Sequence, residues 1–178
     1  MKLPDIERKH VIQFCSGLSD ALPVKIPLRP LKDADQRDCF NILSEHVAEH
    51  GGSQLFGWSI WEWPSVMIEA EFHSVWKNDA GEIIDLTPKP KYFEYTIFVH
   101  DSSKVYQGRQ VNNIRKPIAK GLTTKKYIET ADEIYAEMNK GDLANYHGEL
   151  EATPKLMRLH QKMADLQRKL MKKHGSPN

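Results

Sequence analysis

The sequence has few cysteines, almost no net charge and no long apolar run, so it lacks the features that identify several classes of protein directly. Its 178 residues include only two cysteines, Cys15 and Cys39, so we expect neither a disulfide framework nor a cysteine-based zinc site. A formal net charge of +1 gives no overall field for attracting nucleic acid or a membrane surface. The N-terminus has no apolar run of the signal-peptide type, and no segment approaches the roughly 20 apolar residues that span a bilayer. We therefore expect a cytoplasmic protein with reduced thiols, no membrane association and no bound cofactor.

The periodicity of apolar residues predicts an α+β protein. Residues 23–32 contain three prolines and are expected to form an extended connector, and residues 104–128 are expected to be irregular. The boundaries suggest a core domain over 1–128 and a helical extension over 129–178, packed on the core or on a partner. Helices are predicted at about 6–18, 33–49, 129–139 and 154–173, and strands at 54–63, 67–77, 82–86 and 92–100.

The predicted strand 67–77 carries ionisable residues along one face. Alternation places Glu69, Glu71 and His73 on one side and a mostly apolar row on the other. Carboxylates beside a histidine can raise its pKa or select its tautomer. The alternative is a solvent-facing row without a function.

The hairpin that follows relates His73 to Asp85. An odd loop centred on Asp79 places these two residues opposite each other, whereas a four-residue loop places Asp85 opposite Ser74. Gly81 fits a bulged turn, which would leave Asp85 one diagonal step from His73. The pattern permits a His–Asp pair without requiring it.

Cys39, in the first half of a predicted helix, is the candidate nucleophile for such a pair. A helix N-terminus and a neighbouring imidazolium both stabilise a thiolate. Cys15 lies among the apolar positions of its own predicted helix and is expected to be a core residue.

A cysteine on a helix, "FHSVW" on a strand and "GEIIDLTP" on the next strand resemble the transglutaminase-like superfamily of papain-like cysteine enzymes. The resemblance covers about residues 33–90 and implies a helix packed on a small antiparallel sheet. It also implies Cys39 as nucleophile, His73 as general base and acid, and Asp85 as the group that orients the imidazole. The implied activity is a hydrolase or acyltransferase acting on an amide or thioester of a small molecule or peptide.

Three further residues are candidates for the oxyanion or substrate site. Gln36 is suited to donate to an oxyanion beside the Cys39 backbone N–H. Trp58, in the tryptophan-rich stretch, and Glu71 are candidate substrate-binding residues. The glycine-rich lead of the arylamine acetyltransferase branch is absent before Cys39, so that branch's substrate is not expected.

Other readings remain open. His46 and His50 have the spacing of a metal-chelating pair, although no metal site is expected. The heptad-like apolar seam at 154–173 is a candidate surface for self-association, and its basic faces are expected to be solvated rather than to bind nucleic acid. Arg109 and Arg115 could bind an acidic group or partner, although a structural loop is expected for the stretch 104–116 that contains them. The alternative to an enzyme is a binding module of the same fold that uses the tryptophan-rich sheet and the seam helix.

Overall fold

A computed structural model describes the chain except for residues 33, 35–38, 142, 144–151 and 178. The chain divides into two compact units. The first, here called the helical unit, consists of Met1–Lys2, Glu62–Glu69 and Gln107–Asn178. The second, the sheet unit, consists of Leu3–Trp61 and Ala70–Tyr106. The boundary expected after residue 128 lies within a helix, α3 (Leu122–Met138), that belongs wholly to the helical unit.

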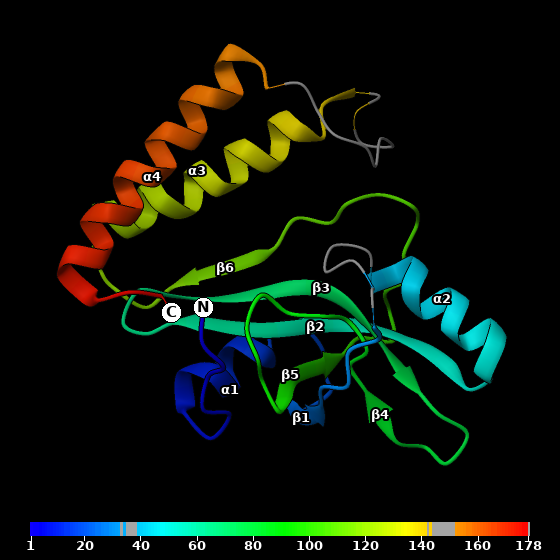
Figure 1. The fold of residues 1–178 in the computed structure, drawn as a ribbon. Coiled ribbons are helices and arrows are strands. Elements are labelled where there is room, and N and C mark those ends of the chain that lie inside the picture. Colours follow the sequence, from blue (N-terminus) through cyan, green and yellow to red (C-terminus); the bar gives the residue numbers. More distant parts are fainter. Residues whose placement is uncertain (33, 35–38, 142, 144–151, 178) are drawn as a thin grey trace. The chain divides into compact units, whose positions relative to one another are not determined.

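The described residues form helices and one antiparallel sheet, which confirms the α+β class (Figure 1). The strands run β1-β5-β2-β3-β4 across the sheet, and β6 pairs with β3. The prediction was most accurate for the two long strands, because aromatic and long apolar residues dominate both. The strand bounds are β1 (Val24–Pro27), β2 (Ser53–Trp63), β3 (Met67–Lys77), β4 (Ile83–Ile84), β5 (Tyr95–His100) and β6 (Ile114–Pro117).

The two ends of the strand order meet at Asp85. Leu28, directly after β1, forms a parallel bridge with Asp85, directly after β4. Arg29 N donates to Asp85 O at 2.9 Å, and Asp85 N donates to Pro27 O at 3.0 Å. The sheet is therefore nearly closed. The proline-rich stretch that we expected to be a plain connector supplies the strand that makes this closure, because β1 pairs with β5 along an edge where prolines are tolerated.

Two helices belong to the sheet unit, α1 (Lys9–Cys15) and α2 (Cys39–His50). The predicted beginning of α2 falls on residues 33–38, most of which lie outside the described residues. Its end agrees with the prediction, because Gly51 adopts the left-handed φ of 75° that stops a helix. Leu43 of α2 packs in a buried cluster with Ile84 and Leu86, so the helix is fastened beside β4.

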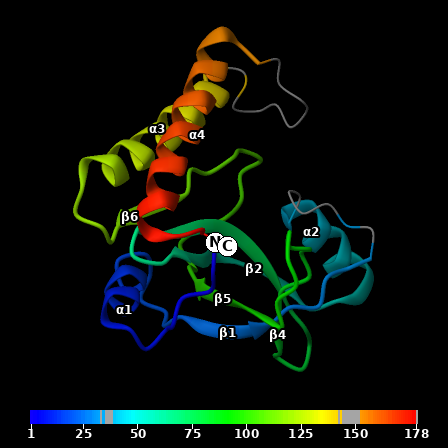
Figure 2. The same ribbon diagram turned by 60° about the vertical axis from the view of Figure 1, so that its left-hand side comes forward.

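The helical unit contains β6, α3 and α4 (Pro154–His174), and the two helices lie side by side in both views (Figures 1 and 2). The prediction for residues 104–128 was wrong, because β6 and the first seven residues of α3 lie there. The β6 segment is polar and mostly exposed, and Thr123 and Thr124 near the start of α3 are β-branched, so neither element has a strong apolar period.

The apolar seam of α4 is buried within this chain. Leu156, Leu159, Leu166 and Leu170 are buried, and Leu170 packs against Trp63, Val66 and Met67. The seam that suggested self-association is thus used inside the helical unit. Its flanking cations are partly paired: Lys155 with Glu137, Lys162 with Glu133, and Arg168 with Asp165.

None of the helices in the described part of the chain combines the length and apolar character needed to cross a membrane.

Candidate functional site

The hairpin between β3 and β4 brings His73 and Asp85 together along a diagonal. Trp76 pairs with Ile84 and Lys77 with Ile83, so continuing the register places Asp85 opposite Val75. Asp85 is then one diagonal step from His73 and on the same face. The five-residue loop 78–82 produces this arrangement, with Gly81 at φ 86° and Asn78 bound to Glu82. Of the alternatives that the sequence left open, the structure has the diagonal one.

The side chains of this pair are buried and in contact. His73 Nε2 lies 3.1 Å from Asp85 Oδ1, and the two residues are 3% and 0% exposed. The other partners of Asp85 are Thr87 N, which donates to Oδ1 at 3.0 Å, and Thr96 Oγ1, which donates to Oδ2 at 3.1 Å. The carboxylate is consequently held by strands on both sides of the closure and cannot rotate away from the imidazole.

A lysine that sequence reasoning missed completes this cluster. Lys89 Nζ lies 3.2 Å from Asp85 Oδ2 and 3.4 Å from His73 Nε2, with its side chain 8% exposed. It follows Asp85 by four residues in "DLTPKP", where two prolines made the segment look like a simple strand end. No pattern in the sequence pointed to it. Lys89 lies in an irregular segment, where neither helical nor strand spacing predicts the direction of a side chain.

Cys39, the first residue of α2, is held to β3 through its main chain. Ser74 Oγ donates to Cys39 O at 3.0 Å. Gln54 Nε2 donates both to Ser74 Oγ at 3.1 Å and to Phe40 O at 3.0 Å. Two neighbouring residues of β3 thus interact with Cys39. Ser74 donates a hydrogen bond to the Cys39 carbonyl, and the Cys39 side chain contributes to the pKa of His73.

The imidazole of His73 is set to be protonated. Burial alone would lower its pKa, but the charge of Asp85 outweighs burial and the opposing charge of Lys89, so the pKa of His73 is raised to about 9. A side-chain hydrogen bond with Cys39 acts in the same direction. Since Asp85 faces Nε2, Nδ1 is the ring nitrogen left for the thiol.

The carboxyl of Asp85 is correspondingly ionised. Burial would raise its pKa, but the positive charge and hydrogen bond of His73, together with Lys89 and the Thr87 N–H, hold the pKa of Asp85 well below its usual range. The cluster therefore contains a stable carboxylate and a stable imidazolium in contact.

The two thiols of the chain have different surroundings. Cys15, on α1, is 0% exposed, and burial raises its pKa to about 11. Cys39 is 7% exposed and has the imidazole beside it. Cys15 is therefore a core residue, as its apolar neighbours indicated, and it offers an internal reference for the chemistry of Cys39.

The structure places His73 and Asp85 in contact, with Cys39 held to the same strand by Ser74. Gln36 lies outside the described residues. Trp58 is buried and donates its indole N–H to Asp101 Oδ2 at 3.1 Å. Glu71 is exposed and accepts from Trp61 Nε1 at 3.1 Å. Within the described part of the chain, the hydrogen bonds of Trp58 and Glu71 thus do not join them to the Cys39 cluster.

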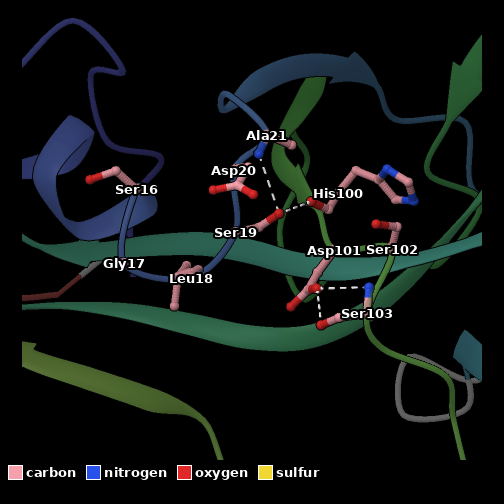
Figure 3. Close-up of a pocket in the computed structure, with 10 residues that line it drawn as sticks. All are labelled: Ser16, Gly17, Leu18, Ser19, Asp20, Ala21, His100, Asp101, Ser102 and Ser103. Atoms are coloured by element: carbon pink, nitrogen blue, oxygen red, sulfur yellow. Dashed lines mark hydrogen bonds between the residues drawn. The ribbon is translucent and has the colours of Figure 1, made fainter.

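A separate polar cleft of about 400 Å³ lies between the end of α1 and the end of β5 (Figure 3). Its buried polar groups are bonded to one another. Asp101 Oδ1 accepts from Ser103 N and Oγ, and Ser19 Oγ donates to His100 O at 2.8 Å (Figure 3). These bonds fasten the α1–β1 connection to the end of β5, so we interpret the cleft as structural.

The histidines of α2 are arranged as a stack. The rings of His46 and His50 lie 4.2 Å apart, and the edge of His46 meets Trp76 at 4.6 Å. Burial and the neighbouring His50 lower the pKa of His46. Among the described residues there is no group of three His, Cys, Asp or Glu side chains that could hold a metal ion.

Comparison with known proteins gives no assignment: no family model, no curated protein and no solved structure matches this chain. The function must be inferred from the residues themselves.

Proposed function

We propose that this protein is a cysteine-dependent hydrolase or acyltransferase that acts on an amide or thioester through an acyl-enzyme on Cys39. The observation that carries the proposal is the buried contact of His73 with Asp85, on the strand whose next residue, Ser74, holds the carbonyl of Cys39. This is the nucleophile, base and orienting group of covalent acyl transfer. The transglutaminase-like resemblance of the same three residues supports it.

The chemistry assigned to each residue follows from the cluster. The reactive form is the Cys39 thiolate beside the His73 imidazolium, and the thiolate attacks the carbonyl carbon. The imidazolium then returns the proton to the departing amine or thiol, leaving a thioester on Cys39. Water, or a second nucleophile in an acyltransferase, loses a proton to His73 as it attacks this thioester, which releases the acyl group and restores the thiol. Asp85 holds the ring for both transfers.

Site-resolved alkylation tests the nucleophile. Iodoacetamide is added at pH 6 to 9, and labelling of Cys39 and Cys15 is followed separately by peptide mass spectrometry. We expect Cys39 to label well below pH 8 and much faster than Cys15. His73→Ala should abolish the difference, whereas His100→Ala, a histidine elsewhere in the sheet unit, should preserve it. Equal labelling of the two cysteines in the wild-type protein would refute the proposal.

Acyl transfer itself is tested with an activated thioester or p-nitrophenyl ester. An acyl adduct should appear on Cys39 after acid quenching and should be absent from Cys39→Ser at that position. A fast-labelling Cys39 that takes up no acyl group from either probe would restrict the proposal to a reactive thiol.

The binding-module alternative finds less support. It assigned the ligand surface to the tryptophan-rich sheet and assembly to the α4 seam. All four indole N–H groups instead donate within the chain, and the seam leucines are buried.

A further inference from the structure

The buried cluster contains a fourth charged side chain, Lys89, which the acyl-transfer roles of Cys39, His73 and Asp85 do not require. Lys89 Nζ contacts both Asp85 Oδ2 and His73 Nε2, at 3.2 and 3.4 Å, and is almost fully covered. Asp85 already has Thr87 N, Thr96 Oγ1 and His73 as donors, so the lysine is not needed to satisfy the carboxylate. Burying an ammonium is costly, which calls for another reason for its position.

We propose that Lys89 is a positioning residue that balances the charge of the site, so that Cys39 can be a thiolate while His73 is an imidazolium. The proposal rests on the proposed function, since it concerns the reactive form of the same thiol. It assigns a role to a residue outside the three that carry the acyl-transfer chemistry.

Counting charges shows what the lysine changes. With Asp85 negative and Lys89 positive, the site is neutral both when Cys39 and His73 are uncharged and when they form a thiolate–imidazolium pair. Proton transfer between them then leaves the net charge unchanged. Adding a further proton, to give a thiol beside an imidazolium, makes the buried site positive, and the charge of Lys89 acts against that form by lowering the pKa of His73.

Without Lys89 the preference reverses. The thiol, the imidazolium and the Asp85 carboxylate together are neutral, whereas the thiolate form carries a net negative charge. The thiol beside the imidazolium is then favoured over the thiolate, and Cys39 keeps its proton to a higher pH. The groups in contact with His73 that enter this count, among the described residues, are Cys39 from α2 and Asp85 and Lys89 from the segment after β4.

The pH profile of Cys39 alkylation tests this role. In Lys89→Met, we expect the midpoint of the profile to move upward by about one pH unit, because the site loses a positive charge that favours the thiolate. Lys89→Gln keeps an N–H donor for Asp85 without the charge and should shift the midpoint in the same direction. Lys89→Arg keeps the charge and should leave the midpoint near the wild-type value. Lys91→Met, an exposed lysine two residues away, is the matched control.

The outcomes separate this proposal from the one on which it depends. If wild-type Cys39 labels no faster than Cys15, the nucleophile itself is wrong. If Cys39 labels fast and the profiles of Lys89→Met and Lys89→Gln coincide with the wild-type profile, only the role of Lys89 is overturned. A uniform loss of rate at every pH without a change of midpoint also overturns it, because that result indicates a packing role.

Discussion

His73 and Asp85 are not opposite each other in the β3–β4 hairpin, yet His73 Nε2 and Asp85 Oδ1 are 3.1 Å apart. Diagonal neighbours on one face of an antiparallel pair lie within reach of long side chains. The five-residue loop after Lys77 sets that geometry, so the contact depends on loop length as much as on the identity of the two residues.

The His73–Asp85 pair should make stability depend on pH. The pKa of His73 is about 9 in the folded protein and near 6.5 when unfolded, so its stabilising contribution is fully present below pH 6.5. That contribution, about 3 kcal/mol at most, is lost as pH rises through 9. Urea unfolding at pH 6.5 and pH 9.5 should show a larger loss for the wild type than for His73→Gln. Equal losses would contradict the raised pKa.

Asp85 predicts the opposite sign at low pH. Its pKa is lowered by folding, so its contribution is present above the unfolded value near 3.8 and is lost as pH falls below it. Asp85→Asn should cost about 3–5 kcal/mol at pH 7, because it leaves His73 and Lys89 as buried cations without their counter-ion. The acid unfolding midpoint of the wild type tests the loss of stability at low pH. The urea midpoint of Asp85→Asn at pH 7 tests the cost of removing the charge. An asparagine variant within 1 kcal/mol of the wild type would argue against a buried ionic cluster.

Ser74→Ala should weaken both the fold and the reactivity of Cys39. The Oγ of Ser74 fixes Cys39 O, and its loss removes the donor of that carbonyl and leaves the Gln54 amide bonded to Phe40 O, at a cost of about 1–3 kcal/mol. Ser59→Ala is the matched control, because Ser59 is equally buried on β2 but its hydroxyl has no hydrogen-bond partner among the described residues. The free energy of unfolding, measured in urea, and the iodoacetamide rate of Cys39 should both be lower in Ser74→Ala. Neither should change in the same way in Ser59→Ala.

Arg115 should be structural rather than a partner-binding residue. Its guanidinium contacts Glu69 Oε2 at 2.6 Å and Asp132 Oδ1 at 3.1 Å, all within the helical unit. Arg115→Met leaves Glu69 largely covered without its cation, and we expect a loss of about 2–4 kcal/mol in the free energy of unfolding. Cys39 alkylation in the native protein should not change. A stable variant would reopen the interpretation of this arginine as a binding residue.

Leu170 should be a major contributor to the helical unit. It is 2% exposed and packs on Trp63, Val66 and Met67, so Leu170→Ala should cost about 2–5 kcal/mol. The neighbouring Met171 is 38% exposed, and Met171→Ala should cost under about 1 kcal/mol. Thermal or urea unfolding of the two variants, measured side by side, provides the comparison. Similar losses for both would mean that the seam is not packed as described.

The elements that could be predicted from the sequence are those with strong local signals. The strands β2 and β3 follow from their aromatic and long apolar residues, and α4 follows from its leucine spacing and Pro154. β6 could not be found, because Ile114–Pro117 is a short and mostly exposed strand whose partner lies about 45 residues earlier. The start of α3 was missed because residues 122–128 have little apolar period.

The same distinction applies to the site. His73 and Asp85 could be suggested by alternation, since strand geometry limits where they point. Lys89, Ser74 and Gln54 could not, because each acts through a contact that only the packed structure makes. Trp58 and Glu71 were chosen for their residue type, and their hydrogen bonds turn out to lie with Asp101 and Trp61.

The main chain of Asp85 joins the two ends of the sheet, while its side chain holds His73. Bringing residues 28 and 85 together is a long-range contact, and such contacts form late because much of the intervening chain must first be ordered. Before this bridge forms, the main chain of Asp85 is held only through the β3–β4 hairpin, so we expect the imidazole to be less firmly oriented. The alkylation rate of Cys39 during refolding would then report when the sheet is completed.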